Sequence, residues 1–159
     1  MLHTLVRDWM AQELIMVGPE TKIIEAYQLM IYDRIRRLPV VICDRLIGIV
    51  TLSDLYQVKP FYILGEEEQT LCQKLEQMTV EEVMTSDPIT IAEDATIGET
   101  AQKMLENKIS GLLVVDPKGG SLVGIITESD IFRIVAQEWS TRQHGSIHLP
   151  RKSKTLDKT

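Results

Sequence analysis

The sequence predicts an α+β fold made of two tandem copies of one β-α-β-β-α motif. The clearest observation is a repeated heptapeptide, because "GIVTLSD" at residues 48–54 returns as "GIITESD" at residues 124–130. Further segments repeat around it in the same order, and each copy alternates helical and strand-like periodicity. One copy of about 55 residues is too small to bury a sheet alone. We therefore expect the copies to pack on each other through related faces.

The first elements of the motif can be followed in both copies. The segment "VRDWM" at residues 6–10 matches "VEEVM" at residues 80–84. The next segment predicts an amphipathic helix, because apolar residues recur at positions i, i+4, i+7 and i+8. These residues are Ile23, Tyr27, Met30 and Ile31 in the first copy and Ile97, Ala101, Met104 and Leu105 in the second.

The remaining elements are strands and a turn. A leading strand is expected before the helix, at "LIMVG" (14–18) and "DPITI" (87–91). After the helix, "RRLPVV" (36–41) and "SGLLVV" (110–115) predict a buried strand. A turn follows, "ICDRL" in the first copy and the longer "DPKGGSL" in the second. Two extra residues are tolerated at a hairpin tip, and a second strand and helix complete each motif.

The repeat divides the chain into four parts. These are a first motif at residues 1–58, a connecting segment at 59–78, a second motif at 79–139 and a basic tail, expected to be flexible, at 140–159. Lys59 and Pro60 should end the preceding helix, because the residue before a proline disfavours helical backbone. The connecting segment predicts a helix from Glu66 onward. Its apolar residues on one side are Leu71, Leu75 and Met78.

Composition and charge exclude several classes of protein. The chain is 44% hydrophobic and 25% charged, which is typical of a folded domain, and no apolar run approaches the ~20 residues of a membrane span. The start lacks a secretory signal, so we expect a cytoplasmic protein in which Cys43 and Cys72 are buried or half-buried free thiols. The net charge of −6 argues against a nucleic-acid surface. Only the basic tail, with five basic side chains against Asp157, could contribute one.

The end of the repeated heptapeptide has two interpretations. As a structural feature, Thr51 and Thr127 can cap the following helix, with Asp54 and Asp130 returning a hydrogen bond to the cap amide. As a binding feature, a helix N-terminus beside a threonine hydroxyl suits a phosphate, and an aspartate accepts hydrogen bonds from both hydroxyls of a ribose. Phosphate and ribose together indicate a nucleotide. Spacing alone leaves both interpretations open.

The ordered series as a whole resembles a known family. "VMT..PITI", an amphipathic helix, "ISGLLVVD" and "GIITESD" resemble the CBS domain, and two copies resemble a CBS pair, or Bateman module, of the free-standing bacterial and archaeal type. The resemblance covers about residues 3–138. It implies a three-stranded sheet with two helices per motif, so that small mixed sheets are flanked by helices and the two motifs are related by pseudo-two-fold symmetry. The resemblance further implies homodimers shaped as flat discs. It also implies regulation by an adenosine nucleotide held in clefts between the motifs and sensed through dimer shape or partner affinity.

The resemblance also implies roles for individual residues. The threonine and aspartate of each heptapeptide would hold phosphate and ribose, and apolar segments would lie beside adenine at Ile15 and Met16 and at Ile89 and Thr90. Arg36 and Arg37 match basic residues that contact phosphate in several CBS families. The second copy has Ser110 and Gly111 there, so we expect unequal sites. The first should prefer the phosphate-rich end of a nucleotide, and the second should take a less charged adenosine compound. Candidate ligands are AMP, ADP, ATP, S-adenosylmethionine and NAD.

Catalysis finds no support in the sequence. All three histidines lie near the ends, and the patterns of zinc proteases, serine hydrolases, phosphate loops and paired metal ligands are absent. We therefore expect no catalytic residue, no metal site and no required cofactor. Two hypotheses remain. The first is a nucleotide-binding regulator that acts on an unidentified effector protein, and the second is a ligand-free CBS pair that serves as an oligomerisation module. The sequence does not identify the nucleotide, the target, the dimer orientation or the role of the tail.

Overall fold

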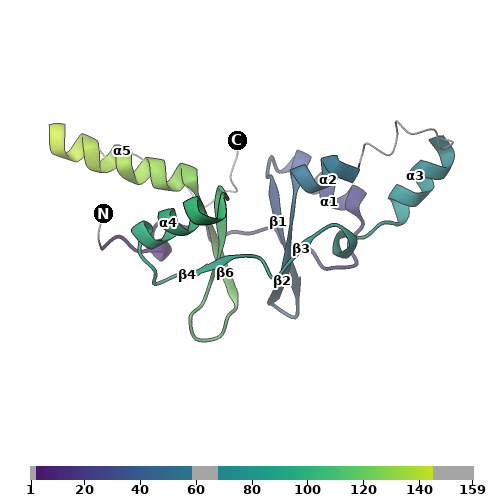
Figure 1. Ribbon diagram of the computed structural model, residues 1–159, viewed down its shortest axis with the longest axis horizontal. Helices are drawn as coiled ribbons and strands as arrows, with labels where there is room; N and C mark the ends of the chain where they lie inside the picture. Colours follow the sequence, from purple (N-terminus) through teal and green to yellow (C-terminus); the bar gives the residue numbers. More distant parts are fainter. Residues whose placement is uncertain (1–2, 59–67, 145–159) are drawn as a thin grey trace. The chain divides into compact units, whose positions relative to one another are not determined.

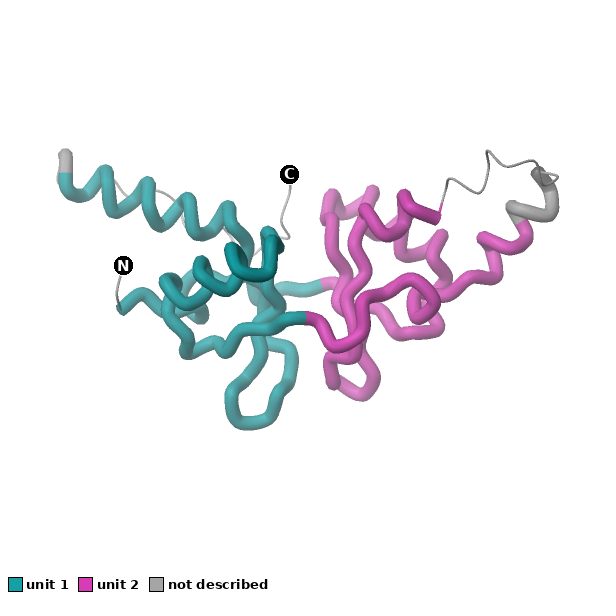
Figure 2. Tube along the Cα trace, in the orientation of Figure 1, with its two compact units in different colours: residues 1–14, 89–155 teal, residues 15–88, 156–159 magenta. Residues whose placement is uncertain are grey.

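The computed structural model describes residues 3–58 and 68–144 (Figure 1). They form two compact units, each considered by itself (Figure 2). In the described part of the chain, unit 1 consists of residues 3–14 and 89–144, and unit 2 consists of residues 15–58 and 68–88. The segment 3–14, which opens the first copy of the repeat in sequence, therefore belongs in space to the unit that carries the second copy.

Unit 2 is built on a three-stranded antiparallel sheet. Its strands are β1 (Arg37–Ile42), β2 (Arg45–Thr51) and β3 (Thr85–Ser86), in the order β1-β2-β3. The β1–β2 hairpin turns through Cys43 and Asp44, whose φ values of 47° and 63° are left-handed. A two-residue turn of this hand matches the twist of the paired strands. Cys43 is a free thiol, as expected, but it is exposed and not buried or half-buried, because it lies at the tip of the hairpin.

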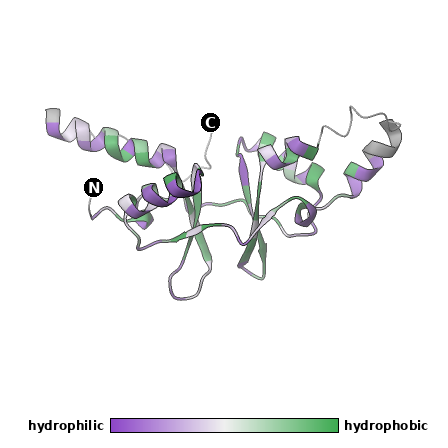
Figure 3. Ribbon diagram, in the orientation of Figure 1, coloured by the Kyte–Doolittle hydropathy of each residue, from purple (hydrophilic) through white to green (hydrophobic). Residues whose placement is uncertain are grey.

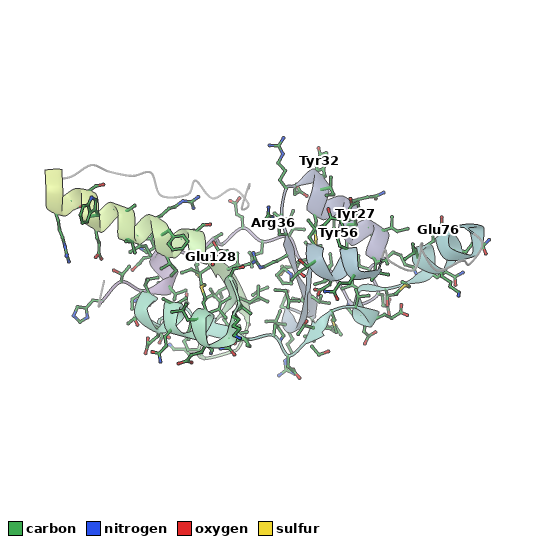
Figure 4. All side chains as sticks on the ribbon, turned by 45° about the horizontal axis from the view of Figure 1, so that its top comes forward. Tyr27, Tyr32, Arg36, Tyr56, Glu76 and Glu128 are labelled. Atoms are coloured by element: carbon green, nitrogen blue, oxygen red, sulfur yellow. The ribbon has the colours of Figure 1, made fainter. Side chains whose placement is uncertain are left out.

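The helices of unit 2 enclose its core. They are α1 (Ile23–Tyr32), α2 (Leu52–Val58) and α3 (Glu68–Gln77), and a 3-10 turn, η3 (Val80–Glu82), precedes β3. Tyr27 on α1 and Tyr56 on α2 meet edge to face with ring centroids 6.3 Å apart (Figure 4). The connecting helix expected from the sequence is present as α3, and Leu75 and Met78 pack on the core of unit 2. The side chains of Leu71 and Cys72 lie outside the described residues.

The leading strand expected at residues 14–18 is not formed, which corrects the prediction for the first copy. The segment makes a single parallel bridge, in which Val17 pairs with Val40 of β1. The chain then turns, because the Thr21 amide donates to the Gly18 carbonyl. Pro19 lies within this turn and has no amide hydrogen with which to extend the ladder. The parallel part of this sheet is therefore one residue long.

Unit 1 has the mixed sheet that the motif predicts. Its strands are β4 (Thr90–Ala92), β5 (Gly111–Val115) and β6 (Leu122–Thr127), in the order β4-β5-β6. The first pair is parallel and the second antiparallel. Two helices follow the strands, α4 (Ile97–Asn107) and α5 (Glu128–His144). The two helices contact each other, and α4 also contacts β5, while α5 contacts β6.

The ends of α4 show why the sequence folds this way locally. Thr96 accepts a hydrogen bond from the Glu99 amide at 3.2 Å, and the Glu99 carboxylate accepts one from the Thr96 amide at 2.7 Å. This reciprocal capping box satisfies two amides that a helix start leaves free. The helix ends at Lys108, whose left-handed φ of 52° lets its amide bond back to the last turn.

Each unit has its own apolar core, and Figure 3 shows hydrophobic residues concentrated on the strands. The core of unit 1 contains Val6, Ile97, Leu112, Val114, Ile126 and Ile134, among others. The core of unit 2 contains Ala26, Met30, Leu38, Val40, Val50 and Val80, among others. Among the described residues no helix is both long enough and apolar enough to cross a bilayer. Residues 145–159 of the expected tail lie outside the described part of the chain.

Candidate functional site

The repeated threonine and aspartate lie at the same structural position in both units, where a strand ends and a helix begins. In unit 2, Thr51 is the last residue of β2 and Asp54 lies in the first turn of α2. Oδ2 of Asp54 accepts from the Thr51 amide at 2.7 Å and from the Thr51 hydroxyl at 2.8 Å. The Asp54 amide donates to Thr51 Oγ1 at 3.2 Å. The capping predicted from the sequence is therefore present, and both side chains are half-buried.

In unit 1 the same arrangement is more deeply buried. Oδ2 of Asp130 accepts from the amide and the hydroxyl of Thr127, each at 2.9 Å. Thr127 is 4% exposed and Asp130 only 2%. The second carboxylate oxygen, Oδ1, accepts from Nη1 of Arg133 at 3.2 Å. The two aspartates thus share one set of partners, and Asp130 has an additional ion pair.

The strand that pairs with each threonine places one residue directly opposite it. Arg37 is the cross-strand partner of Thr51 in unit 2, and Gly111 is the partner of Thr127 in unit 1. The residue before each partner closes the start of the helix through its backbone. The carbonyl of Arg36 accepts from the Leu52 amide at 2.9 Å, and that of Ser110 accepts from the Glu128 amide at 3.0 Å. Arg36 and Ser110 therefore occupy equivalent positions.

The side chains at these positions differ as the sequence analysis expects. The Arg36 side chain, labelled in Figure 4, is exposed and makes no hydrogen bond or ion pair with the other described residues. Arg37 and Ser110 are half-buried, and each has an interaction partner. Unit 2 therefore carries an available guanidinium one residue from the threonine's strand partner, whereas unit 1 carries a short hydroxyl.

The four residues expected beside adenine are placed less uniformly. Met16 and Ile89 are exposed, at 44% and 39%. Ile15 is half-buried and packs on the core of unit 2, as a residue with a structural role would. Thr90 is half-buried, and its backbone carbonyl accepts a hydrogen bond from Lys103 Nζ at 2.7 Å. Its carbonyl is therefore already engaged.

Two side-chain contacts at the site, those of Arg133 and Lys103, were not predicted from the sequence. The ion pair of Arg133 with Asp130 was not predicted, although a position three residues later on the same helix is a spacing typical of ion pairs. Lys103 reaches Thr90 from α4, thirteen residues away. No local pattern indicates that contact.

Unit 1 also contains a cavity of about 340 Å³ between residues 4–9 and the second half of α5. Trp9, Ile134 and Gln137 contribute to its lining. Oε1 of Gln137 is buried and has no hydrogen-bond donor in the described part of the chain. The cavity is separate from the Thr127–Asp130 pair. Among the described residues no cluster of histidine, cysteine, aspartate or glutamate could hold a metal ion.

The fold and the duplicated strand-to-helix junction define the class of protein. The family model of the CBS domain matches residues 6–59 and 80–137. The chain belongs to the CBS domain family and carries two copies of the domain. The resemblance seen in the sequence is therefore confirmed, together with the α+β fold class.

Relatives include both enzymes and proteins of similar size. The chain is 32% identical to inosine-5'-monophosphate dehydrogenase of Korarchaeum cryptofilum over 135 residues, which cover 85% of this chain and 25% of the enzyme. It is 31% identical over 135 residues to a CBS domain-containing protein of Dictyostelium discoideum, covering 84% of this chain and 92% of that protein. The chain thus spans about a quarter of the enzyme's length and most of the Dictyostelium protein.

Two similar solved structures contain ligands. CBSX2 of Arabidopsis thaliana in complex with AMP is similar with a TM-score of 0.71 and 29% identity, covering 86% of this chain and 98% of that chain. The CBS domain pair of protein MJ0100, in complex with 5'-methylthioadenosine and S-adenosylmethionine, is similar with a TM-score of 0.68 and 33% identity. That match covers 85% of this chain and 98% of the other. All three ligands contain adenosine.

Proposed function

We propose that the chain is a regulatory module that binds an adenosine nucleotide through the threonine and aspartate of each repeat. The observation that carries the proposal is the duplicated junction itself. In both units a carboxylate and a hydroxyl are held together within 2.9 Å where a strand meets a helix. A carboxylate oriented in this way can accept hydrogen bonds from ribose hydroxyls, and the threonine hydroxyl can turn to donate to a phosphate.

The ligand class is supported by the relatives. CBSX2 is in complex with AMP, and the MJ0100 pair is in complex with 5'-methylthioadenosine and S-adenosylmethionine. Adenosine is what these ligands share, and a ribose-binding aspartate recognises that shared part. AMP, ADP, ATP, S-adenosylmethionine and NAD are the candidates for this chain. Their charges differ, so the basic residues around each junction should select among them.

The two junctions should not bind equally. Arg36 supplies an exposed guanidinium in unit 2, and a guanidinium binds phosphate through two parallel hydrogen bonds. Ser110 supplies a single hydroxyl at the equivalent position in unit 1. Unit 2 is therefore proposed to hold the more strongly charged nucleotide. Binding at either unit would act on an effector protein by shifting the chain, or its homodimer, toward the arrangement that binds the ligand better.

Calorimetric titration of nucleotide-stripped protein with the five candidates tests this function. Saturable binding of at least one below millimolar concentration is expected. Asp54→Ala and Asp130→Ala should each remove one site, and each should lower the free energy of unfolding by about 1 kcal/mol through the lost cap. Thr96→Ala, which removes a cap on α4 away from both junctions, is the control that should lose stability and keep binding.

The alternative function is a ligand-free oligomerisation module. One observation favours it, because each threonine–aspartate pair already satisfies its capping hydrogen bonds without a ligand. If both aspartate variants bind a nucleotide as the wild type does, the ribose role assigned to these aspartates is wrong, although the protein still binds a nucleotide. If none of the five candidates binds, the junctions serve only as helix caps. The proposed nucleotide function would then be wrong, and protein partners would have to be sought instead.

A further inference from the structure

The ion pair between Arg133 and Asp130 distinguishes the two junctions. Nη1 of Arg133 lies 3.2 Å from Oδ1 of Asp130, while Oδ2 of the same carboxylate accepts from Thr127. The Asp130 side chain is 3% exposed, whereas that of Arg133 is 43% exposed. The carboxylate of Asp130 is therefore buried, and the partly exposed guanidinium of Arg133 is hydrogen-bonded to its second oxygen. A ribose that binds this oxygen would compete with Arg133 for it.

Unit 2 lacks this pair at the corresponding place. The residue equivalent to Arg133, 76 positions earlier as in the rest of this helix, is Gln57, which is exposed. Asp54 is half-buried, and its hydrogen bonds are those with Thr51. The two copies thus differ at one charge close to an aspartate whose Oδ2 atom accepts from the preceding threonine in both units.

We infer that Arg133 is a latch on Asp130 that makes unit 1 selective for adenosine ligands carrying a phosphate. This inference rests on the proposed nucleotide function. A ribose that takes Oδ1 must displace the guanidinium, and a guanidinium that loses its carboxylate needs another anion. Side chains on a helix point back toward its N-terminus, so from the first turns of α5 the displaced guanidinium can reach the helix start. A phosphate held near Thr127 would be its new partner.

The latch should weaken the binding of adenosine and leave the binding of AMP nearly unchanged. AMP can exchange one anionic partner of Arg133 for another, so the displacement costs little. Adenosine offers no anion, so its binding loses the ion pair without replacement. A hydrogen bond involving a charged group contributes enough to change affinity by about tenfold. We therefore expect unit 1 to prefer AMP over adenosine although its strand carries no arginine.

The test is titration with AMP and with adenosine in an Asp54→Ala background, which confines binding to unit 1. In Arg133→Gln, adenosine affinity should rise and AMP affinity should not, so that the ratio of the two dissociation constants changes by about tenfold. Arg133→Lys keeps the charge and should retain most of the preference for AMP. Gln57→Arg in an Asp130→Ala background should introduce the preference into unit 2. Circular dichroism verifies that each variant is folded.

The outcomes separate this inference from the proposed function. If AMP binds and the ratio is unchanged in Arg133→Gln, the latch is wrong and the nucleotide function stands. A fall in AMP and adenosine affinity by the same factor also overturns the latch, because it means that Arg133 only positions Asp130. Should neither AMP nor adenosine bind in the Asp54→Ala background, the latch is wrong, whereas the nucleotide function fails only if none of the five candidates binds to the wild type.

Discussion

The thioether of Met10 occupies the space beside Gly124 that a side chain would need. A Cβ built on Gly124 would lie 2.6 Å from Met10 Sδ and 2.9 Å from the carbonyl oxygen of Ala11. Unit 2 repeats the contact, because a Cβ on Gly48 would lie 2.5 Å from Met84 Sδ. The methionine that ends "VRDWM" and "VEEVM" therefore packs on the glycine that begins "GIIT" and "GIVT". One contact in each unit therefore explains why both the methionine and the glycine recur in the repeat.

Gly124→Ala and Gly48→Ala should each destabilise the protein. The added methyl group must displace a methionine and also meets backbone oxygen, and overpacking of this kind costs about 1–3 kcal/mol in the free energy of unfolding. Urea denaturation measures the loss. Gly18→Ala is the matched control, because nothing lies within 4 Å of its Cβ position. Equal stability of all three variants would show that the methionine contacts tolerate a methyl group.

Short-range sequence patterns predicted those helices, strands and caps whose formation depends on neighbouring residues. The helices α1 and α4 follow from apolar spacing, the strand pairs follow from β-branched runs, and the caps at Thr51 and Thr127 follow from an acid three residues later. Each of these depends on residues within one or two turns of each other. The strand expected at residues 14–18 failed because a turn at Gly18 and Pro19 interrupts it. The strand expected at residues 87–91 begins only at Thr90, and the short strand β3 was not expected.

Long-range pairing could not be predicted in the same way. The segment 3–14 joins unit 1 through hydrogen bonds such as that from the Val6 amide to the Ala95 carbonyl at 2.9 Å. The matching Val80 amide bonds to Thr21 at 2.8 Å in unit 2. Because the two segments are copies of one pattern, the sequence shows that each must pack on a sheet but not on which one. The contact of Lys103 with Thr90 was missed for a similar reason, since no pattern links the two residues.

The capping box of α4 should make stability depend on pH. The amide and the hydroxyl of Thr96 donate to Glu99 and lower the pKa of its carboxyl below the ordinary value of 4.5. A lowered pKa in the folded state means that the stabilisation is present above the unfolded pKa and is lost as pH falls through the folded pKa. Urea midpoints measured from about pH 5 to pH 3 should therefore fall more steeply for the wild type than for Glu99→Gln.

The control for this pH effect is Glu76→Gln. Glu76 lies exposed on α3 (Figure 4) and has no hydrogen bond or ion pair with the other described residues. Replacing Glu76 by glutamine should leave the pH dependence of the urea midpoint as it is in the wild type. If Glu99→Gln and Glu76→Gln show the same curve, the capping box does not depend on the ionised form of Glu99.

Gln137→Met should stabilise the protein. Oε1 of Gln137 is buried beside a cavity and accepts no hydrogen bond from the described residues, and an unsatisfied buried oxygen costs about 1–3 kcal/mol. Methionine keeps the length of the side chain and removes the polar atom. A gain of about 1 kcal/mol in the free energy of unfolding is expected. Gln102→Met, at an exposed position on α4, should change stability little, and a loss at Gln137 would mean that its amide has a partner.

The face of α5 that carries Phe132, Val135 and Trp139 should mediate the proposed homodimer. These side chains are 67%, 45% and 66% exposed, and their spacing of i, i+3 and i+7 places them on one stripe of the helix. Trp139→Glu should shift the molar mass measured by light scattering from dimer to monomer. Ile42→Glu introduces the same charge at another exposed apolar residue, at the β1–β2 hairpin, and should leave the mass unchanged. A dimer that survives Trp139→Glu uses a different surface.

Replacing Arg36 and Arg37 by alanine together tests whether unit 2 binds phosphate. Arg36 has an exposed guanidinium at the start of β1, and Arg37 is the strand partner of Thr51. If they contact phosphate, their loss should weaken ATP and AMP binding by at least about tenfold and adenosine binding much less, because adenosine carries no phosphate. Titration in an Asp130→Ala background confines the measurement to unit 2. An equal loss for all three ligands would mean that the arginines support the fold of β1 and do not contact phosphate.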